Sequence, residues 1–318
     1  MKKYTFTPKP DHMAKKPEVS GNDINGLGEA SFRNPSLIYW AEDPTTIPHG
    51  EMQLWFYTHN TGEELQKARD ERALISTIKD SPVAPLKLEV NKGDATALIK
   101  EQAKKLGAAD CGITAVDPAW AFEGKSISTY PNVVVLALAQ DYDAMNTAPE
   151  NTAGAEVVKI YGEGYRASHM LANWIRERGY QARASAGPTS GDFTMIPAAL
   201  RAGLGELGKH GSVIHPKLGS NFRLACVLTD MPLELDIPTD FGADGFCSNC
   251  QICMRACPVD AIFPDKKLVR GMEKYYVDFD KCIPFFNEHA GCGVCMIACP
   301  WSRPGVADKM RAKLAKKR

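Results

Sequence analysis

Near its C-terminus the chain reads Cys247-Ser-Asn-Cys-Gln-Ile-Cys-Met-Arg-Ala-Cys-Pro258, in which four cysteines are spaced C-x2-C-x2-C-x3-C-P. A second motif begins at Cys282, is spaced C-x9-C-x2-C-x3-C-P and ends at Pro300. In the bacterial two-cluster pattern, three closely spaced thiolates bind one 4Fe–4S cubane, and the cysteine before the proline binds the other cubane. The sequence therefore predicts a ferredoxin-like domain with two clusters side by side. The longer x9 gap departs from simple ferredoxins by one extended loop.

Crossed ligation of this kind divides eight of the ten cysteines into two sets. The first set is Cys247, Cys250, Cys253 and Cys299, and the second set is Cys282, Cys292, Cys295 and Cys257. A pair of zinc sites is the alternative, because closely spaced cysteine pairs also bind zinc. The proline after both fourth cysteines favours iron–sulfur clusters. The remaining Cys111 and Cys226 lie in apolar runs and are expected in the core.

The composition excludes some classes of partner. The chain has 318 residues, with 38 basic and 38 acidic side chains, so no overall charge draws it to nucleic acid or to an anionic membrane. The longest apolar run, residues 133–139, is far shorter than the roughly 18 residues that cross a bilayer. The N-terminal residues Met-Lys-Lys-Tyr-Thr-Phe are followed by polar and Pro-rich sequence without an apolar export segment. We therefore expect a cytoplasmic protein without a membrane span.

Upstream of the cysteines, helical and strand patterns alternate, which predicts an α+β core. Leu98, Ile99, Ala103 and Leu106 recur at helical spacing before Gly107, where a helix is expected to end. Further helices are expected at about 154–178 and 196–202, and strands at 111–116, 133–139 and 223–229. We divide the chain into an irregular N-terminal wrapping segment (1–90), a core domain (91–235) and a ferredoxin-like domain (236–318).

Three segments together resemble the cobalamin-dependent reductive dehalogenases, with which the epoxyqueuosine reductases share a core plan. They are the two cysteine motifs, at 246–262 and 292–302, and the run Ala202-Gly-Leu-Gly-Glu-Leu-Gly-Lys209. Many families share the cysteine motifs, so the run at 202–209 does most to distinguish this family from the others. The resemblance covers roughly residues 95–303. It implies a nitroreductase-like core that binds a corrinoid and receives electrons from the nearer cluster. The positions that it implies for corrinoid binding are Gly203, Leu204, Gly205, Lys209 and His210. Glycines allow close approach of backbone to a flat macrocycle, although a Gly-rich segment alone is more often a plain turn.

By the same resemblance, Tyr165 falls at the family's tyrosine proton donor and Arg223 falls at its pocket arginine. A phenol keeps its proton at neutral pH and can give it to a carbanion-like carbon. Arg223 would favour the resulting phenolate, so we expect the two to act as one unit. Tyr161, one turn earlier, is the rival donor. The plainer alternatives are a core tyrosine on an amphipathic helix and an arginine in a surface ion pair.

A third polar pocket residue is expected among Thr189, Ser190 and Asp192, but the sequence does not show which one faces the pocket. Asp192 would serve either as an acid or as a cap for the helix that begins near Thr194.

These features predict a reductive dehalogenase that replaces a halogen of a small organohalide with hydrogen. The expected partner is a reduced ferredoxin or a flavodoxin-like electron donor, and a homodimer is left open. The first alternative is an epoxyqueuosine reductase acting on tRNA. It is disfavoured by the zero net charge and by the short sequence after Trp301. The second alternative is a non-catalytic electron carrier.

Overall fold

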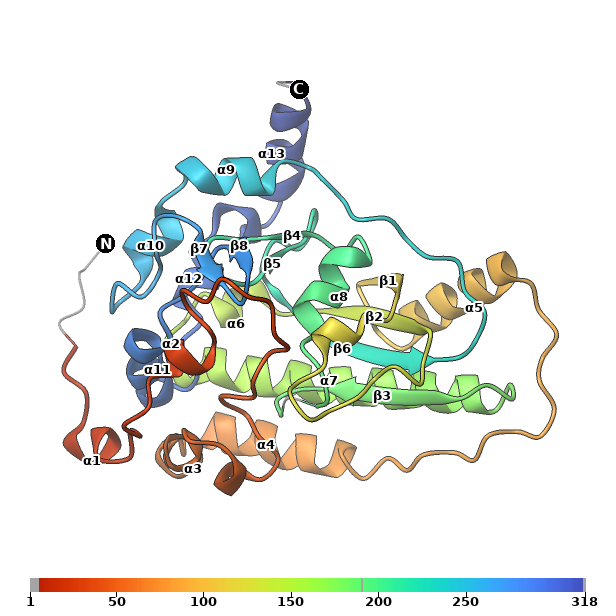
Figure 1. The fold of residues 1–318 in the computed structure, drawn as a ribbon, viewed down its shortest axis with the longest axis horizontal. Coiled ribbons are helices and arrows are strands. Elements are labelled where there is room, and N and C mark those ends of the chain that lie inside the picture. The colour runs from red at the N-terminus through yellow and green to blue at the C-terminus, as the bar shows by residue number, and fades with distance from the viewer. Residues whose placement is uncertain (1–5, 190, 317–318) are drawn as a thin grey trace.

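The computed structural model describes residues 6–189 and 191–316. At its centre is a four-stranded antiparallel sheet (Figure 1). The strands lie in the order β1 (Asp110–Ala115), β2 (Asn132–Ala139), β6 (Phe222–Thr229) and β3 (Ala182–Ala186). The apolar β2 and β6 occupy the middle because a strand covered on both faces is apolar on both. Their register sets Leu138 opposite Arg223.

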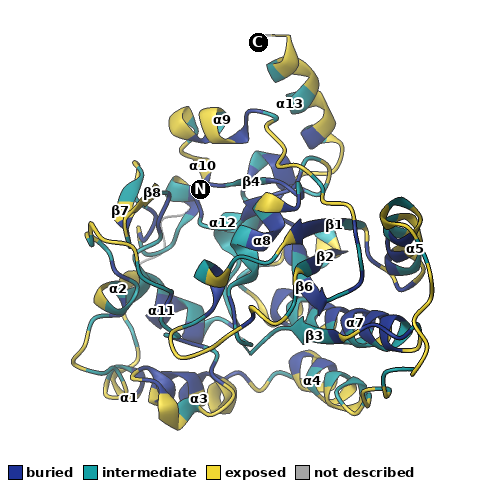
Figure 2. Cartoon of the chain, turned by 45° about the vertical axis from the view of Figure 1, so that its right-hand side comes forward, coloured by how far each residue is buried: buried dark blue, intermediate teal, exposed yellow. Residues whose placement is uncertain are grey.

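Helices cover both faces of this sheet, as expected for an α+β core. The face formed by Val134, Leu136 and Val227 packs against α5 (Lys92–Lys105) and α7 (Asn151–Arg176). The opposite face, which carries Val133, Val135 and Cys226, packs against α8 (Met195–Arg201). Neighbouring residues of one strand reach opposite faces because side chains alternate along a strand. Figure 2 shows the resulting concentration of buried residues on the sheet and α7.

The structure confirms the helices and strands expected between residues 94 and 229, with small differences at their ends. α5 ends where expected, since Gly107 adopts a φ of +97° that favours glycine at a helix C-terminus. Strand β3 was not expected, because its sequence Ala-Arg-Ala-Ser-Ala lacks the branched and aromatic residues typical of strands. Shorter elements complete the core: η2 (Pro118–Trp120), α6 (Tyr142–Met145), β4 (Glu206–Leu207) and β5 (Val213–Ile214).

The N-terminal segment is more regular than the sequence suggested. It contains α1 (Pro10–Met13), α2 (Gly21–Ile24), η1 (Pro44–Thr46), α3 (Gly50–His59) and α4 (Glu63–Ile75). The interpretation of residues 1–90 as irregular is therefore wrong for α3 and α4. α4 buries only Leu65 and Ala68, so its apolar periodicity is weak, although its Glu, Gln, Lys, Arg and Ala residues favour helix intrinsically. It packs along α7.

The cysteine-rich region consists of short elements beside the core (Figure 1). In chain order they are α9 (Ala243–Asn249), α10 (Ile252–Ala256), the hairpin β7 (Lys267–Val269) and β8 (Met272–Lys274), α11 (Phe279–Glu288), α12 (Val294–Ile297), η3 (Pro300–Ser302) and α13 (Val306–Ala315). The N-terminal segment is fastened to α11: Ser20 donates to the Asp280 carboxylate at 2.5 Å, and Asn60 donates to the Asn287 carbonyl at 2.8 Å. Among the described helices, none combines the length and the apolar character needed to cross a membrane.

Candidate redox and catalytic site

The structure gathers the eight motif cysteines into two neighbouring groups. The Cys299 thiol interacts electrostatically with those of Cys247, Cys253 and Cys250. The Cys295 thiol interacts with those of Cys292, Cys282, Cys257 and, across the groups, Cys253. This proximity follows the crossed pattern expected from the spacing, and the assignment of individual ligands stays a prediction.

Burial raises the pKa of several of these thiols. It raises the pKa of Cys247 and Cys253 to about 11 and that of Cys282 to about 12. In the metal-free protein these three thiols therefore keep their protons at neutral pH, and binding of iron must release them. Two groups of four cysteines, carried by short helices and the turns between them, have the donor chemistry that suits a pair of 4Fe–4S clusters.

Lys209 lies against the first group, although the sequence placed it at the corrinoid. Its side chain is only 1% exposed. Its ammonium donates to the Ser248 carbonyl at 3.4 Å and lies 5.8 Å from the centre of the Tyr275 ring. Its backbone N–H donates to the Cys247 thiol. The structure therefore brings a buried cation to the first cysteine group.

The other positions expected at the corrinoid contact protein atoms. A Cβ at Gly203 would lie 2.5 Å from the Ile237 carbonyl oxygen, and one at Gly205 would lie 2.2 Å from that of Ile214. Leu204 is buried in the core beside α8. His210 lies 3.0 Å from the Ser220 hydroxyl, and burial lowers its pKa to about 4. The glycines are thus explained by close approach of backbone to backbone, and contact of this segment with a corrinoid stays a prediction.

Arg223 lies between the second cysteine group and α7. Its guanidinium lies 5.5 Å from the centre of the Tyr161 ring and contacts the Met296 sulfur at 3.8 Å. Met296 directly follows the motif residue Cys295. The tyrosine beneath the guanidinium is Tyr161, and the joint action of Arg223 and Tyr165 expected from the sequence stays a prediction. The two tyrosines are four residues apart, so they lie one turn apart on the same side of α7. Arg223 on β6 reaches the turn that carries Tyr161.

Tyr165 faces a polar pocket of about 280 Å³. Its ring stacks on His169 at 3.8 Å, and its hydroxyl donates to the Ser76 carbonyl at 3.3 Å. Burial lowers the pKa of His169, so its imidazole is neutral at neutral pH. Other residues that line the pocket are Arg72, Arg183, Ser185, Thr189, Gly191 and Asp192.

The structure settles two of the three open polar positions. Thr189 and Asp192 both line this pocket, and Ser190 lies outside the described residues. The Asp192 carboxylate forms a 2.6 Å ion pair with Arg183, while the N-cap of α8 is Thr194. The capping role considered for Asp192 is therefore wrong, because Thr194 occupies the N-cap position and no side chain caps α8.

Two buried polar atoms, one on Arg223 and one on the neighbouring Gln140, are suited to hold a cofactor. Within the described residues, Arg223 Nε and Gln140 Oε1 have no hydrogen-bond partner. Gln140 follows β2, and its backbone pairs with Asn221 just before β6, so it neighbours Arg223. A buried donor and a buried acceptor without partners are costly. Amide groups, which surround the edge of a corrinoid ring, would satisfy both, so the polar residues fit such a group.

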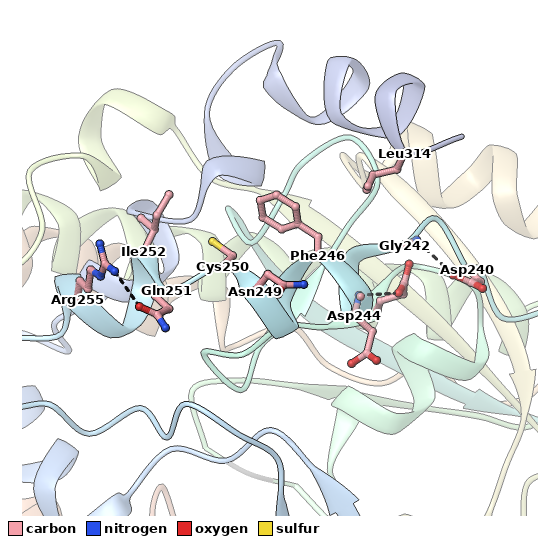
Figure 3. A pocket seen from close by; sticks show the side chains of 12 residues that line it. Asp240, Gly242, Asp244, Phe246, Asn249, Cys250, Gln251, Ile252, Arg255 and Leu314 are labelled. Atoms are coloured by element: carbon pink, nitrogen blue, oxygen red, sulfur yellow. Dashed lines mark hydrogen bonds between the residues drawn. The ribbon is translucent and has the colours of Figure 1, made fainter. Parts of the chain in front are cut away.

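A second, wider hollow of about 920 Å³ opens beside the first cysteine group (Figure 3). Cys250 lies on its wall between α9 and α10, and Phe246, Ile252 and Leu314 provide apolar surface around it. Asp244 lies on the same wall and pairs with Lys266 at 2.9 Å. The hollow gives surface access to the cysteine set that is farther from Arg223.

Comparison with known proteins agrees with this geometry. Residues 246–302 match the family model of the 4Fe–4S dicluster domain. The tetrachloroethene reductive dehalogenase of Sulfurospirillum multivorans is 34% identical over 188 residues, which are 56% of this chain and 37% of that protein. A solved catabolic reductive dehalogenase in complex with 3-bromo-4-hydroxybenzoic acid is 27% identical, with a TM-score of 0.68, over 86% of this chain and 40% of that one. The chain resembles the reductive dehalogenases.

This dehalogenase-like chain has more distant relatives too. The epoxyqueuosine reductase of Salmonella typhimurium is 29% identical over 191 residues, which are 50% of this chain and 46% of that protein. The resemblance expected from the sequence is thus confirmed, together with the α+β fold and the dicluster domain. The chain spans about a third of the length of the curated dehalogenases that it matches.

Sequence reasoning missed the contribution of α4 and β3 to the pocket at Tyr165. Arg72 comes from α4, far upstream of every residue used to recognise the site, and Arg183 comes from β3, between Tyr165 and Thr189 in the sequence. The only available signals were arginines in segments of otherwise ordinary surface composition. Such residues become recognisable only when the fold shows what surrounds them.

Proposed function

We propose that this chain is the catalytic unit of a corrinoid-dependent reductive dehalogenase, an oxidoreductase that replaces a halogen of a small organohalide with hydrogen. The balanced reaction consumes the organohalide, two electrons and one proton, and yields the hydrocarbon product and a halide ion. The observation that carries the proposal is the continuous arrangement from two cysteine groups, through Met296 and Arg223, to the tyrosines of α7. The 34% identity to a tetrachloroethene reductive dehalogenase supports the reaction class.

Electrons would enter at the hollow beside Cys250. A small reduced carrier, such as a ferredoxin or flavodoxin-like protein, would donate to the first cluster there, and the second cluster would pass electrons toward Arg223. The electrostatic contact between Cys295 and Cys253 supports this order, because it brings the two groups together. The hollow supports entry at the first group, because it gives access from the surface.

A bound corrinoid would supply low-potential electrons for breaking the carbon–halogen bond. Arg223 and Gln140 would hold its polar edge through their unpartnered buried atoms. Tyr165 or Tyr161 would deliver a proton from its hydroxyl to the substrate carbon as the bond breaks. Arg223, over the Tyr161 ring, would stabilise a phenolate there and attract the departing halide.

Metal analysis followed by activity assay tests the proposal. After anaerobic reconstitution with iron, sulfide and cobalamin, the protein should contain about eight irons and one cobalt per chain, and should release halide from brominated or chlorinated phenols. Iron without cobalt would identify a non-catalytic electron carrier. Reduction of epoxyqueuosine in tRNA without halide release would favour the alternative suggested by the Salmonella typhimurium relative.

A further inference from the structure

Arg72 is a cation that no carboxylate of the described residues pairs with. Its side chain begins on α4 and passes over α7 at Gly162, where a Cβ would lie 3.6 Å from its Cβ and Cγ. Its Nε is buried and lacks a hydrogen-bond partner among the described residues. The titratable neighbours that act on its guanidinium are the phenols of Tyr57, Tyr165 and Tyr161. Arg72 is half-buried, and a partly desolvated cation without an anionic partner is unfavourable, so this position suits an anion.

The other cations around the pocket are already paired. Arg183 forms a 2.6 Å ion pair with Asp192, whose other carboxylate oxygen lies 3.8 Å from Lys125. Arg176, farther along α7, pairs with Asp80 at 2.6 Å. Of the two described arginines that line the pocket, Arg72 is the one without a carboxylate partner. The pocket's other carboxylate, Glu42, is exposed and forms no ion pair with Arg72 among the described residues.

The surroundings of Arg72 suit a flat organic anion. The pocket measures about 280 Å³, which accommodates a molecule with one ring. Neutral His169 stacks on Tyr165, so these two rings add aromatic surface without adding charge. The Tyr165 hydroxyl, a candidate proton donor, lies in the same pocket as the cation. A substrate anchored at Arg72 would thus place its ring beside that hydroxyl.

We propose that Arg72 binds an oxyanion, the carboxylate or phenolate of a halogenated aromatic substrate, and so makes the enzyme selective for anionic organohalides. The inference rests on the proposed function, whose substrate class it narrows. It departs from the neutral substrate in the name of the tetrachloroethene reductive dehalogenase relatives. Arg72 acts here as a binding residue that determines specificity.

The test begins with binding, which needs no turnover. Equilibrium dialysis of the cluster- and cobalamin-loaded protein with halogen-free 4-hydroxybenzoate should show binding that is about 10–100-fold weaker in Arg72→Gln, as expected for loss of a charge-assisted pair. Arg72→Lys keeps the charge without the planar fork and should recover part of the affinity. Lys67→Gln removes an exposed charge from the same helix and serves as the matched control, with affinity equal to that of the wild type.

Turnover then gives the specificity. The ratio of kcat/KM for 3-bromo-4-hydroxybenzoate to that for tetrachloroethene should fall by the same factor in Arg72→Gln. An unchanged ratio together with unchanged 4-hydroxybenzoate affinity would overturn the inference. Loss of cobalt from Arg72→Gln would also overturn it, because the oxyanion would then be a phosphate of the corrinoid. Arg72-dependent binding of 4-hydroxybenzoate without halide release from any substrate would retain the anion site and reject the dehalogenase function.

Discussion

Replacing Lys209 with methionine should lower the reduction potential of the first cluster. The Lys209 ammonium is buried, and its oxygen partner is the carbonyl of Ser248, which lies at the end of α9 between Cys247 and Cys250. It also acts electrostatically on the Cys247 and Cys253 thiols. A cation at this place favours the reduced cluster, which carries one more negative charge. Methionine has a similar length without the charge, so the substitution removes this stabilisation.

The magnitude follows from Coulomb's law. For a charge separation of roughly 6–10 Å and an effective dielectric constant of about 20, one added electron interacts with the ammonium by about 2–3 kcal/mol. One factor of ten corresponds to about 1.4 kcal/mol, or about 59 mV for one electron, so the midpoint should fall by about 70–120 mV. The second cluster, farther from Lys209, should shift less.

The assay is an anaerobic redox titration followed by electron paramagnetic resonance, which reports the cluster and its potential independently of turnover. Lys209→Arg keeps the cation and should restore most of the potential. Lys266→Met is the matched control, because Lys266 lies 5.2 Å from the centre of the same Tyr275 ring but is partly exposed and pairs with Asp244. Its midpoint should stay near that of the wild type, since solvent screens exposed charges. An intact first cluster with an unshifted midpoint in Lys209→Met would refute the reasoning.

Four further predictions address the site. Tyr165→Phe should abolish halide release while leaving cluster spectra and cobalt content intact; substantial remaining activity, together with loss in Tyr161→Phe, would transfer the donor role to Tyr161. Arg223→Leu should slow halide release more than cofactor reduction in stopped-flow traces, and equal losses would argue against a pocket role. Cys257→Ser should perturb the second cluster in the paramagnetic spectrum and spare the first, whereas loss of the first alone would reject crossed ligation. Since burial lowers the pKa of His210 to about 4 from about 6.5 in an unfolded chain, the folded protein resists protonation; stability should therefore fall by about 2 kcal/mol through this residue between about pH 7.5 and about pH 5. Thermal melts of His210→Asn should show a weaker pH dependence, and parallel curves for the two proteins would contradict the assignment.

Local patterns identified the larger elements of the core. The continuous apolar run of β2 predicted a strand, because a strand buried on both faces is apolar throughout. The apolar stripe of α7 predicted a helix, because a helix buried on one side repeats its apolar residues at helical spacing. α3, α4 and β3 escaped prediction for the opposite reason. Their sequences lack a strong periodic pattern, and packing against α11, α7 and β6 stabilises them in the folded chain.

The cysteine spacing alone determined that this protein has a dicluster domain, because short loops bring their thiolates together whatever the remaining chain does. Only the tertiary structure decided the partners of the cations. It placed Arg223 over Tyr161, brought Lys209 to the first cysteine group, and carried Arg72 into the Tyr165 pocket from nearly a hundred residues upstream. The physical reason is that a spacing rule describes neighbours along the chain, whereas the electrostatic environment of a buried charge is set by elements that meet only after folding.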